Sequence, residues 1–148
     1  MQFSSRVMLA SHILLYLAEY EQEEKVTSVV LADTTGANSV NIRKILAKLK
    51  SAGLVEVKAG IGGAYLGKKA CDITLKDIYD AVEDKEALFP MHEHPNIQCP
   101  VGASIQTVME SRVDLLERQL YESMSKMKLS DMYIDMKQEI ERISKAKS

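Results

Sequence analysis

The amino-acid sequence predicts a mainly α-helical fold with a small β-wing, made of a winged helix-turn-helix domain and a long dimerisation helix. Three observations predict this architecture. Residues 26–65 carry two short helical patterns separated by a glycine, followed by two short extended segments joined by a glycine-rich tip. A single apolar stripe at helical spacing runs through residues 105–127. Basic residues concentrate around the second helical pattern and the glycine-rich tip.

Composition limits the class of protein. The chain has 148 residues, of which 46% are apolar, enough for one domain with an extension. No stretch reaches the ~18 uninterrupted apolar residues of a membrane span. The N-terminal segment has apolar residues at helical spacing and no cleavage site, so we expect an amphipathic helix of a cytoplasmic protein rather than a signal sequence. The chain has only two cysteines, Cys71 and Cys99, which is too few for a disulfide framework.

Charge is distributed unevenly along the chain. The formal net charge is −2, yet residues 38–70 contain seven basic residues and one acidic residue, a balance of +6. The rest of the chain therefore carries −8. A basic patch on an otherwise acidic protein is typical of contact with nucleic-acid phosphates, although surface lysines are also common on helices.

The first two helices are predicted from caps and apolar spacing. Ser4 or Ser5 can cap a helix whose apolar residues recur every three or four positions, namely Val7, Ala10, Leu14, Leu17 and Ala18. Thr27 can cap the next helix, which we expect from Ser28 to about Thr34. Gly36 then ends this helix, because glycine readily adopts the left-handed conformation found there.

A third helix, capped by Asn38 or Ser39, is the predicted recognition helix. Its inward face is predicted to carry Val40, Ile42, Ile45, Leu46 and Leu49. Its outward face is predicted to carry Ser39, Asn41, Arg43, Lys44 and Lys48. In a helix-turn-helix, the N-terminal half of the second helix reaches base edges, where Asn can bond to adenine and Arg to guanine or phosphate. We favour capping over base reading for Asn38, and phosphate contact for Arg43 and Lys44.

A two-stranded wing is predicted to follow. Residues 54–58 alternate as a strand, with Val55 and Val57 on one face, and the return strand begins at Tyr65. The glycines between them permit a tight turn, and no Gly-Lys-Ser/Thr follows, which excludes a nucleotide-binding loop. We expect the tip and Lys58 to touch the DNA backbone or minor groove. The complete predicted DNA-binding set is Thr27, Ser28, Asn38, Ser39, Asn41, Arg43, Lys44, Lys48, Lys58, Gly60, Gly62 and Gly63.

The chain divides into three predicted parts. Residues 1–86 form the DNA-binding domain and end in a helix capped by Thr74, with Asp77 completing a capping box. Residues 87–101 form a connecting loop, a possible sensor, punctuated by Pro90, Pro95 and Pro100. Residues 102–148 form the dimerisation helix and a C-terminal helix, for which Ser130 is the expected cap.

The long helix is predicted to pair two copies of the chain. Its apolar residues, spaced three or four apart, are Ile105, Met109, Val113, Leu116, Leu120, Met124 and Met127. Such a stripe is typical of helix-on-helix packing in dimers, and we prefer this interpretation to packing on its own domain.

The joint pattern resembles the Rrf-two family of bacterial transcriptional regulators, which contains the iron–sulfur cluster assembly regulator and the cysteine-metabolism repressor. The resemblance rests on SSRVMLASHILLYLA, VNIRKILAKLKSAGLVE, GIGGAY and ITLKDIYDAVE. It implies a winged helix-turn-helix with a long dimerisation helix, and a homodimer on a palindromic or near-palindromic promoter. Two positions depart from the family's pattern: Ala59 stands where many members carry arginine before the tip glycine, and the tip reads GGA, ending in Ala64, rather than the commoner GGGY or GGF.

The sensor is left open by the sequence. Cluster-bearing members use three cysteines in the loop before the long helix, whereas Cys99 stands alone there, so we expect no iron–sulfur cluster and no other cofactor. Zinc on His92, His94 and Cys99, with Glu93 or Cys71, is a weaker hypothesis because the spacing is unusual. Cys99 at the helix N-terminus favours a redox-sensing thiol, the alternative being an inert residue.

The sequence therefore predicts a DNA-binding transcriptional regulator rather than an enzyme. Neither paired catalytic carboxylates nor a nucleophile–base set stands out. We expect a repressor that binds double-stranded DNA as a homodimer, with thiol-based control or an unknown effector. The alternatives are a winged-helix protein-interaction module without DNA binding, and a zinc- or iron–sulfur-sensing regulator.

Overall fold

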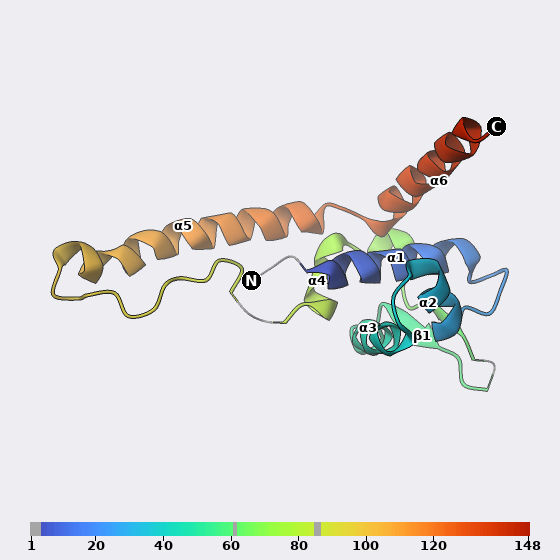
Figure 1. Cartoon of the computed structure of the whole chain (residues 1–148), viewed down its shortest axis with the longest axis horizontal. Helices are drawn as coiled ribbons and strands as arrows, with labels where there is room; N and C mark the ends of the chain where they lie inside the picture. Colours follow the sequence, from blue (N-terminus) through green and yellow to red (C-terminus); the bar gives the residue numbers. More distant parts are fainter. Residues whose placement is uncertain (1–3, 61, 85–86) are drawn as a thin grey trace.

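The computed structural model describes residues 4–60, 62–84 and 87–148. Four helices and a two-stranded wing form a body, from which α5 extends on one side and α6 on the other (Figure 1). The elements are α1 (Ser5–Tyr20), α2 (Ser28–Thr35), α3 (Ser39–Ser51), β1 (Val55–Val57), β2 (Ala64–Leu66), the 3-10 turn η1 (Ala70–Asp72), α4 (Leu75–Val82), α5 (Pro100–Ser125) and α6 (Leu129–Ala146). This confirms the mainly helical fold with a small wing.

The core of the body lies around α1. Four residues of α1 at helical spacing, Val7, Ala10, Leu14 and Leu17, are buried, as is Ile13 beside them. They pack with buried residues of α2, α3 and α4, namely Leu31, Ile42, Ile45, Leu49, Ile78, Tyr79 and Val82. Because each helix turns one apolar face to the same centre, their polar faces are left outside.

Caps set the bounds of the helix-turn-helix as the sequence predicts. The Thr27 hydroxyl accepts the Val30 N–H at 3.2 Å, and Gly36 ends α2 with a left-handed φ of 74°. The Asn38 side chain accepts the Asn41 N–H at 2.9 Å and so begins α3. These short-range bonds fix the turn between α2 and α3.

The wing is an antiparallel pair in which Val55 lies opposite Leu66 and Val57 opposite Ala64. It is fastened to the body because the Ala64 N–H donates to the Val26 carbonyl at 2.8 Å. Val55 and Ala64 are buried, whereas Val57 is 48% exposed. Strand β1 is therefore shorter than the predicted strand over residues 54–58. Val55 and Val57 do not share a buried face as predicted, because the wing extends past the core at Val57.

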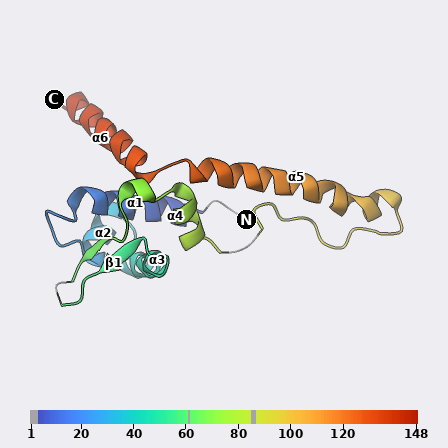
Figure 2. The same ribbon diagram turned by 180° about the vertical axis from the view of Figure 1, so that it is seen from behind.

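Backbone hydrogen bonds fasten the α5–α6 junction to the body. The Leu75 N–H donates to the Met127 carbonyl, and the Leu129 N–H donates to the Ile73 carbonyl, both at 2.8 Å. The predicted capping box of Thr74 and Asp77 is present at the start of α4. From this fixed junction α5 and α6 diverge, as the view from behind also shows (Figure 2).

Three further local expectations are wrong. Val40 is 49% exposed rather than buried, because it lies about 200° around the helix axis from Ile42, which faces the core. Helix α5 begins at Pro100 instead of Gly102, so the connecting loop ends at Cys99. Helix α6 has Lys128, not Ser130, at its N-cap position, with no side-chain cap.

Over the described parts of the chain, no helix combines the length and the apolar character needed to cross a bilayer.

Candidate nucleic-acid interface

The outer face of α3 is polar and open to solvent. Asn41, Arg43 and Lys44 are exposed, and Ser39 is half-buried at the first position of the helix. Within the described residues, neither Arg43 nor Lys44 makes an ion pair. Buried Ile42, Ile45 and Leu49 on the opposite face fix the rotation of α3. The two cations are therefore free to meet phosphate oxygens.

The helix N-termini supply a second set of groups. Thr27 and Asn38 use their side chains as caps, which is the structural role favoured for Asn38. Ser28, half-buried, is the first residue of α2. The N-terminus of a helix carries partial positive charge and free N–H groups, a combination that suits a phosphate.

The wing presents a lysine and a glycine tip. The Lys58 ammonium lies 4.4 Å from the centre of the Tyr65 ring, which holds the charge beside the strand. Gly60, Gly62 and Gly63 all have positive φ, which glycine adopts without strain. A side chain at Gly62 would come within 2.7 Å of the Lys25 Cε, so Lys25 packs against the tip. The sequence analysis did not single out Lys25, because it directly follows the acidic run of residues 19–24.

Lys48 differs from the other predicted DNA contacts. Its ammonium donates to the Val82 carbonyl at 3.3 Å and lies 3.6 Å from an oxygen of Asp84. Arg6 of α1 joins the same group, 3.3 Å from both Glu83 and Asp84. This cluster ties α1 and α3 to the C-terminal end of α4, just before the connecting loop. No short-range pattern in the sequence indicates it, because its members are far apart along the chain.

Cys99 occupies the N-cap position of α5 and is exposed. The backbone N–H groups of Gly102 and then Val101 lower the pKa of its thiol. The Cys99 N–H donates to the Asn96 carbonyl at 3.2 Å, which turns the loop into the helix. A lowered pKa at an exposed position favours thiolate chemistry.

Within the part of the chain that the structure describes, the histidines and cysteines do not gather as an iron–sulfur centre or a zinc site requires. Cys71 lies in η1 on the body, whereas Cys99 lies at the start of α5, which is the end of that helix farther from the body (Figure 1). His92 and His94 are exposed, and His94 lies 3.8 Å from Glu93. Across residues 4–60, 62–84 and 87–148, no three His, Cys, Asp or Glu side chains gather as metal ligands would.

The predicted dimerisation stripe divides into two parts. Met124 is buried at 2% exposure in the core of its own chain, and Leu120 packs against that core. Met124 is thus withdrawn from the dimer surface, because the α5–α6 junction seats it on the body. Toward the other end of α5, Ile105 and Val113 are half-buried. The remaining members, Met109, Leu116 and Met127, are exposed.

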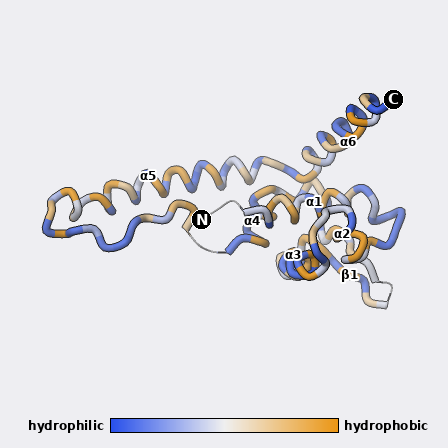
Figure 3. The backbone as a smooth tube through the Cα atoms, viewed as in Figure 1, coloured by the Kyte–Doolittle hydropathy of each residue, from blue (hydrophilic) through white to orange (hydrophobic). Residues whose placement is uncertain are grey.

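A second apolar stripe on α5 escaped sequence reasoning. Val101, Val108 and Leu115 are spaced by seven residues and are 71%, 46% and 46% exposed. Seven residues make nearly two turns, so the three side chains share one edge of the helix. Figure 3 shows apolar segments recurring along α5 outside the body.

Residues 3–135 match the family described as Rrf2, iron-dependent transcriptional regulator. YwnA of Bacillus subtilis (strain 168), named as a candidate HTH-type transcriptional regulator, is 35% identical over 129 residues, which cover 87% of this chain and 95% of YwnA. A solved candidate transcriptional regulator from Lactobacillus plantarum has 26% identity and a TM-score of 0.76, with 90% of each chain covered. IscR of T. potens has 22% identity and a TM-score of 0.68, with 92% of this chain and 88% of IscR covered. Proteins of this class are regulators and not enzymes.

Proposed function

Because this chain belongs to the Rrf2 (Rrf-two) family of transcriptional regulators, we propose that it is a sequence-specific DNA-binding repressor that acts as a homodimer on a palindromic promoter site. We place its action in the bacterial cytoplasm, where promoter DNA is found. It works in this proposal without a bound cofactor.

The observation that carries the proposal is the exposed polar face of α3 beside the wing, on which Arg43 and Lys44 make no ion pair with any described residue. The major groove of B-DNA, about 12 Å wide, admits a helix of this kind. We assign base reading to Ser39 and Asn41, and phosphate contact to Arg43 and Lys44. Lys58 and the glycine tip then follow the adjacent backbone or minor groove, while the N-termini of α2 and α3 receive phosphates. Lys48 holds the end of α4 instead.

The shape of α5 supports pairing with a second copy. Its 26 residues span about 39 Å, and most of that length lies outside the body (Figure 1). Exposed apolar stripes on a projecting helix are costly in water and are removed when two copies cover each other. Twofold pairing places two α3 helices on one face and so requires an operator with matching symmetry.

Control through Cys99 is part of the proposal. Oxidation of an exposed thiolate at the N-terminus of α5 adds polar bulk at the end of the proposed dimer helix. A change there alters how the two recognition helices are spaced. Substituting Cys99→Ser and measuring DNA affinity with and without peroxide tests this step, and an unchanged response to peroxide in the variant would contradict it.

The test of the main proposal is a binding titration over a salt series. The probe is a fragment from upstream of the protein's own gene, with a scrambled fragment of equal length as control. A repressor of this type binds the first fragment tightly, with affinity falling steeply as salt rises. Weak binding to both fragments at all salt concentrations would favour a protein-interaction module.

A further inference from the structure

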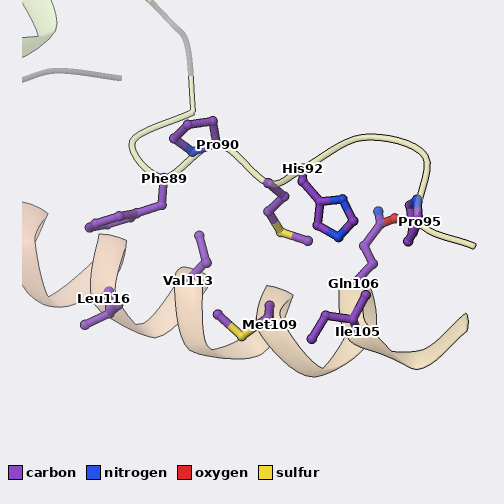
Figure 4. Close-up of a pocket in the computed structure, with 10 residues that line it drawn as sticks. Phe89, Pro90, His92, Pro95, Ile105, Gln106, Met109, Val113 and Leu116 are labelled. Carbon is purple, nitrogen blue, oxygen red and sulfur yellow. The ribbon is translucent and has the colours of Figure 1, made fainter. Parts of the chain in front are cut away.

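The connecting loop turns back along the N-terminal half of α5 and encloses a cavity of about 310 Å³ against it (Figure 4). This volume lies at the lower end of the range for small-molecule sites, which is roughly 300–1,000 Å³. The cavity is remote from the DNA-binding face, and none of the predicted DNA-binding residues lines it. It therefore needs an explanation of its own.

Two contacts hold the loop at a fixed distance from α5. At one end, Leu88 is buried and its N–H donates to the Glu117 carboxylate at 3.2 Å. At the other end, the Asn96 carbonyl approaches Gly102 so closely that a Cβ there would lie 2.0 Å from the carbonyl oxygen. The hollow between these anchors is therefore built into the chain.

The lining is apolar except at one end. Figure 4 shows Phe89, Val113 and Leu116 toward one side, and His92 and Gln106 toward the other. The Gln106 side-chain amide donates to the Glu110 carboxylate at 3.0 Å, and its amide oxygen, which lies beside Pro95 at the rim in Figure 4, is left as an acceptor. The His92 imidazole can donate or accept a hydrogen bond. A ligand head that fits this pair must therefore both donate and accept.

We propose that this cavity binds a small neutral molecule with one six-membered ring and one hydroxyl group, a phenol or a simple aromatic alcohol, as the effector of the regulator. The ring fills the apolar end, and the hydroxyl donates to Gln106 and accepts from His92. A carboxylate head is disfavoured, because it cannot donate to Gln106 and would lie near the charge of Glu110. The role of this ligand as an effector rests on the proposed DNA-binding function. Its binding in the cavity does not.

Occupation of the cavity has a direct route to the proposed dimer surface. The lining residues Ile105 and Met109 belong to the predicted dimerisation stripe, and Val108 between them belongs to the neighbouring exposed stripe. A ligand that separates the loop from α5 changes which apolar side chains remain for a second copy. DNA affinity then follows the dimer geometry.

Isothermal titration of the full chain without DNA tests the site, with phenol, benzyl alcohol and benzoate as probes at millimolar concentration. Met109→Trp and Val113→Trp fill the cavity, and each should weaken phenol binding at least tenfold. Gln106→Leu should weaken it about three- to tenfold, the usual contribution of one neutral hydrogen bond. Thr107→Trp, at an exposed position of the same helix outside both the lining and the two apolar stripes, should bind phenol as the natural chain does. Circular dichroism establishes that the variants keep their helix content.

Three results would overturn the proposal: no binding of phenol or benzyl alcohol by the natural chain, benzoate binding as tightly as phenol, or unchanged phenol affinity in both filled variants. Because these titrations contain no DNA, their failure is distinct from failure of the proposed DNA binding. Adding phenol to the operator titration then tests the regulatory step. Unchanged DNA affinity at saturating phenol would refute the effector role.

Discussion

Removing the two unpaired cations of α3 is the most informative perturbation of the DNA-binding face. The double variant Arg43→Ala with Lys44→Ala truncates two exposed side chains that make no ion pair within the described residues. The buried residues that seat α3 are untouched. We therefore expect DNA affinity to fall while thermal stability stays nearly unchanged.

The magnitude follows from counting phosphates. If both cations contact phosphate in each of two protomers, the double variant loses four contacts per dimer. Each contact contributes about 0.9 to the slope of log affinity against log salt, so the slope should become shallower by about 3 to 4. The loss of affinity should be largest at low salt, where counterion release contributes most.

Fluorescence anisotropy with a labelled operator, over about 50 to 200 mM salt, measures that slope. Lys48→Ala is the matched control, because it removes a cation from the same helix that is bound to Val82 and Asp84 instead. Its slope should stay near that of the natural chain. An unchanged slope in the Arg43/Lys44 double variant would refute the assignment of α3 as the recognition helix. A shallower slope for Lys48→Ala would instead refute the proposal that Lys48 holds the end of α4 and does not contact DNA.

Three further predictions concern stability and the thiol. Met124→Ala should lower the free energy of unfolding by about 2–4 kcal/mol, and Met127→Ala, at a half-exposed position, by less than about 1 kcal/mol; equal losses in urea denaturation would contradict the burial of Met124. Cys99 should react with iodoacetamide at neutral pH faster in the folded chain than in urea, because its pKa is lowered only when α5 is formed; equal rates would contradict this. Hydrogen bonds from Lys137, and then from Tyr133, lower the pKa of the Glu19 carboxyl below its ordinary value of 4.5. These bonds therefore stabilise the folded chain fully above pH 4.5, and this stabilisation is lost as the pH falls through the lower pKa of the folded state. Glu19→Gln should therefore lower the melting temperature at pH 7 but not at strongly acidic pH, and a pH-independent difference would refute this.

Features that depend on neighbours along the chain could be predicted from the sequence. The caps at Thr27, Asn38 and Thr74 and the helix-ending Gly36 are where the sequence places them, because each rests on bonds within a few residues. The apolar spacing of α1 likewise identifies its buried face. The glycine-rich wing follows from the backbone freedom of its tip.

Features that depend on contacts between distant segments could not be predicted. The clamp of Lys48 on Asp84 joins elements 36 positions apart, so nothing near Lys48 distinguishes it from Lys44. The burial of Met124 depends on the junction with α6, and periodicity alone assigned it to the dimer stripe. The cavity exists only because the connecting loop folds back on α5. Gly102 permits the close approach of Asn96, but a single glycine in the sequence does not indicate which segment will approach it.

DNA reading by a homodimer is tested most directly by a hydroxyl-radical footprint on the operator, combined with the number of chains bound. We expect two chains on one operator and two protected segments related by twofold symmetry. Their centres should lie about 10 base pairs, or a multiple of one helical turn, apart. A single protected segment with one bound chain, or equal protection along an unrelated sequence, would contradict the claim that this protein reads DNA as a homodimer.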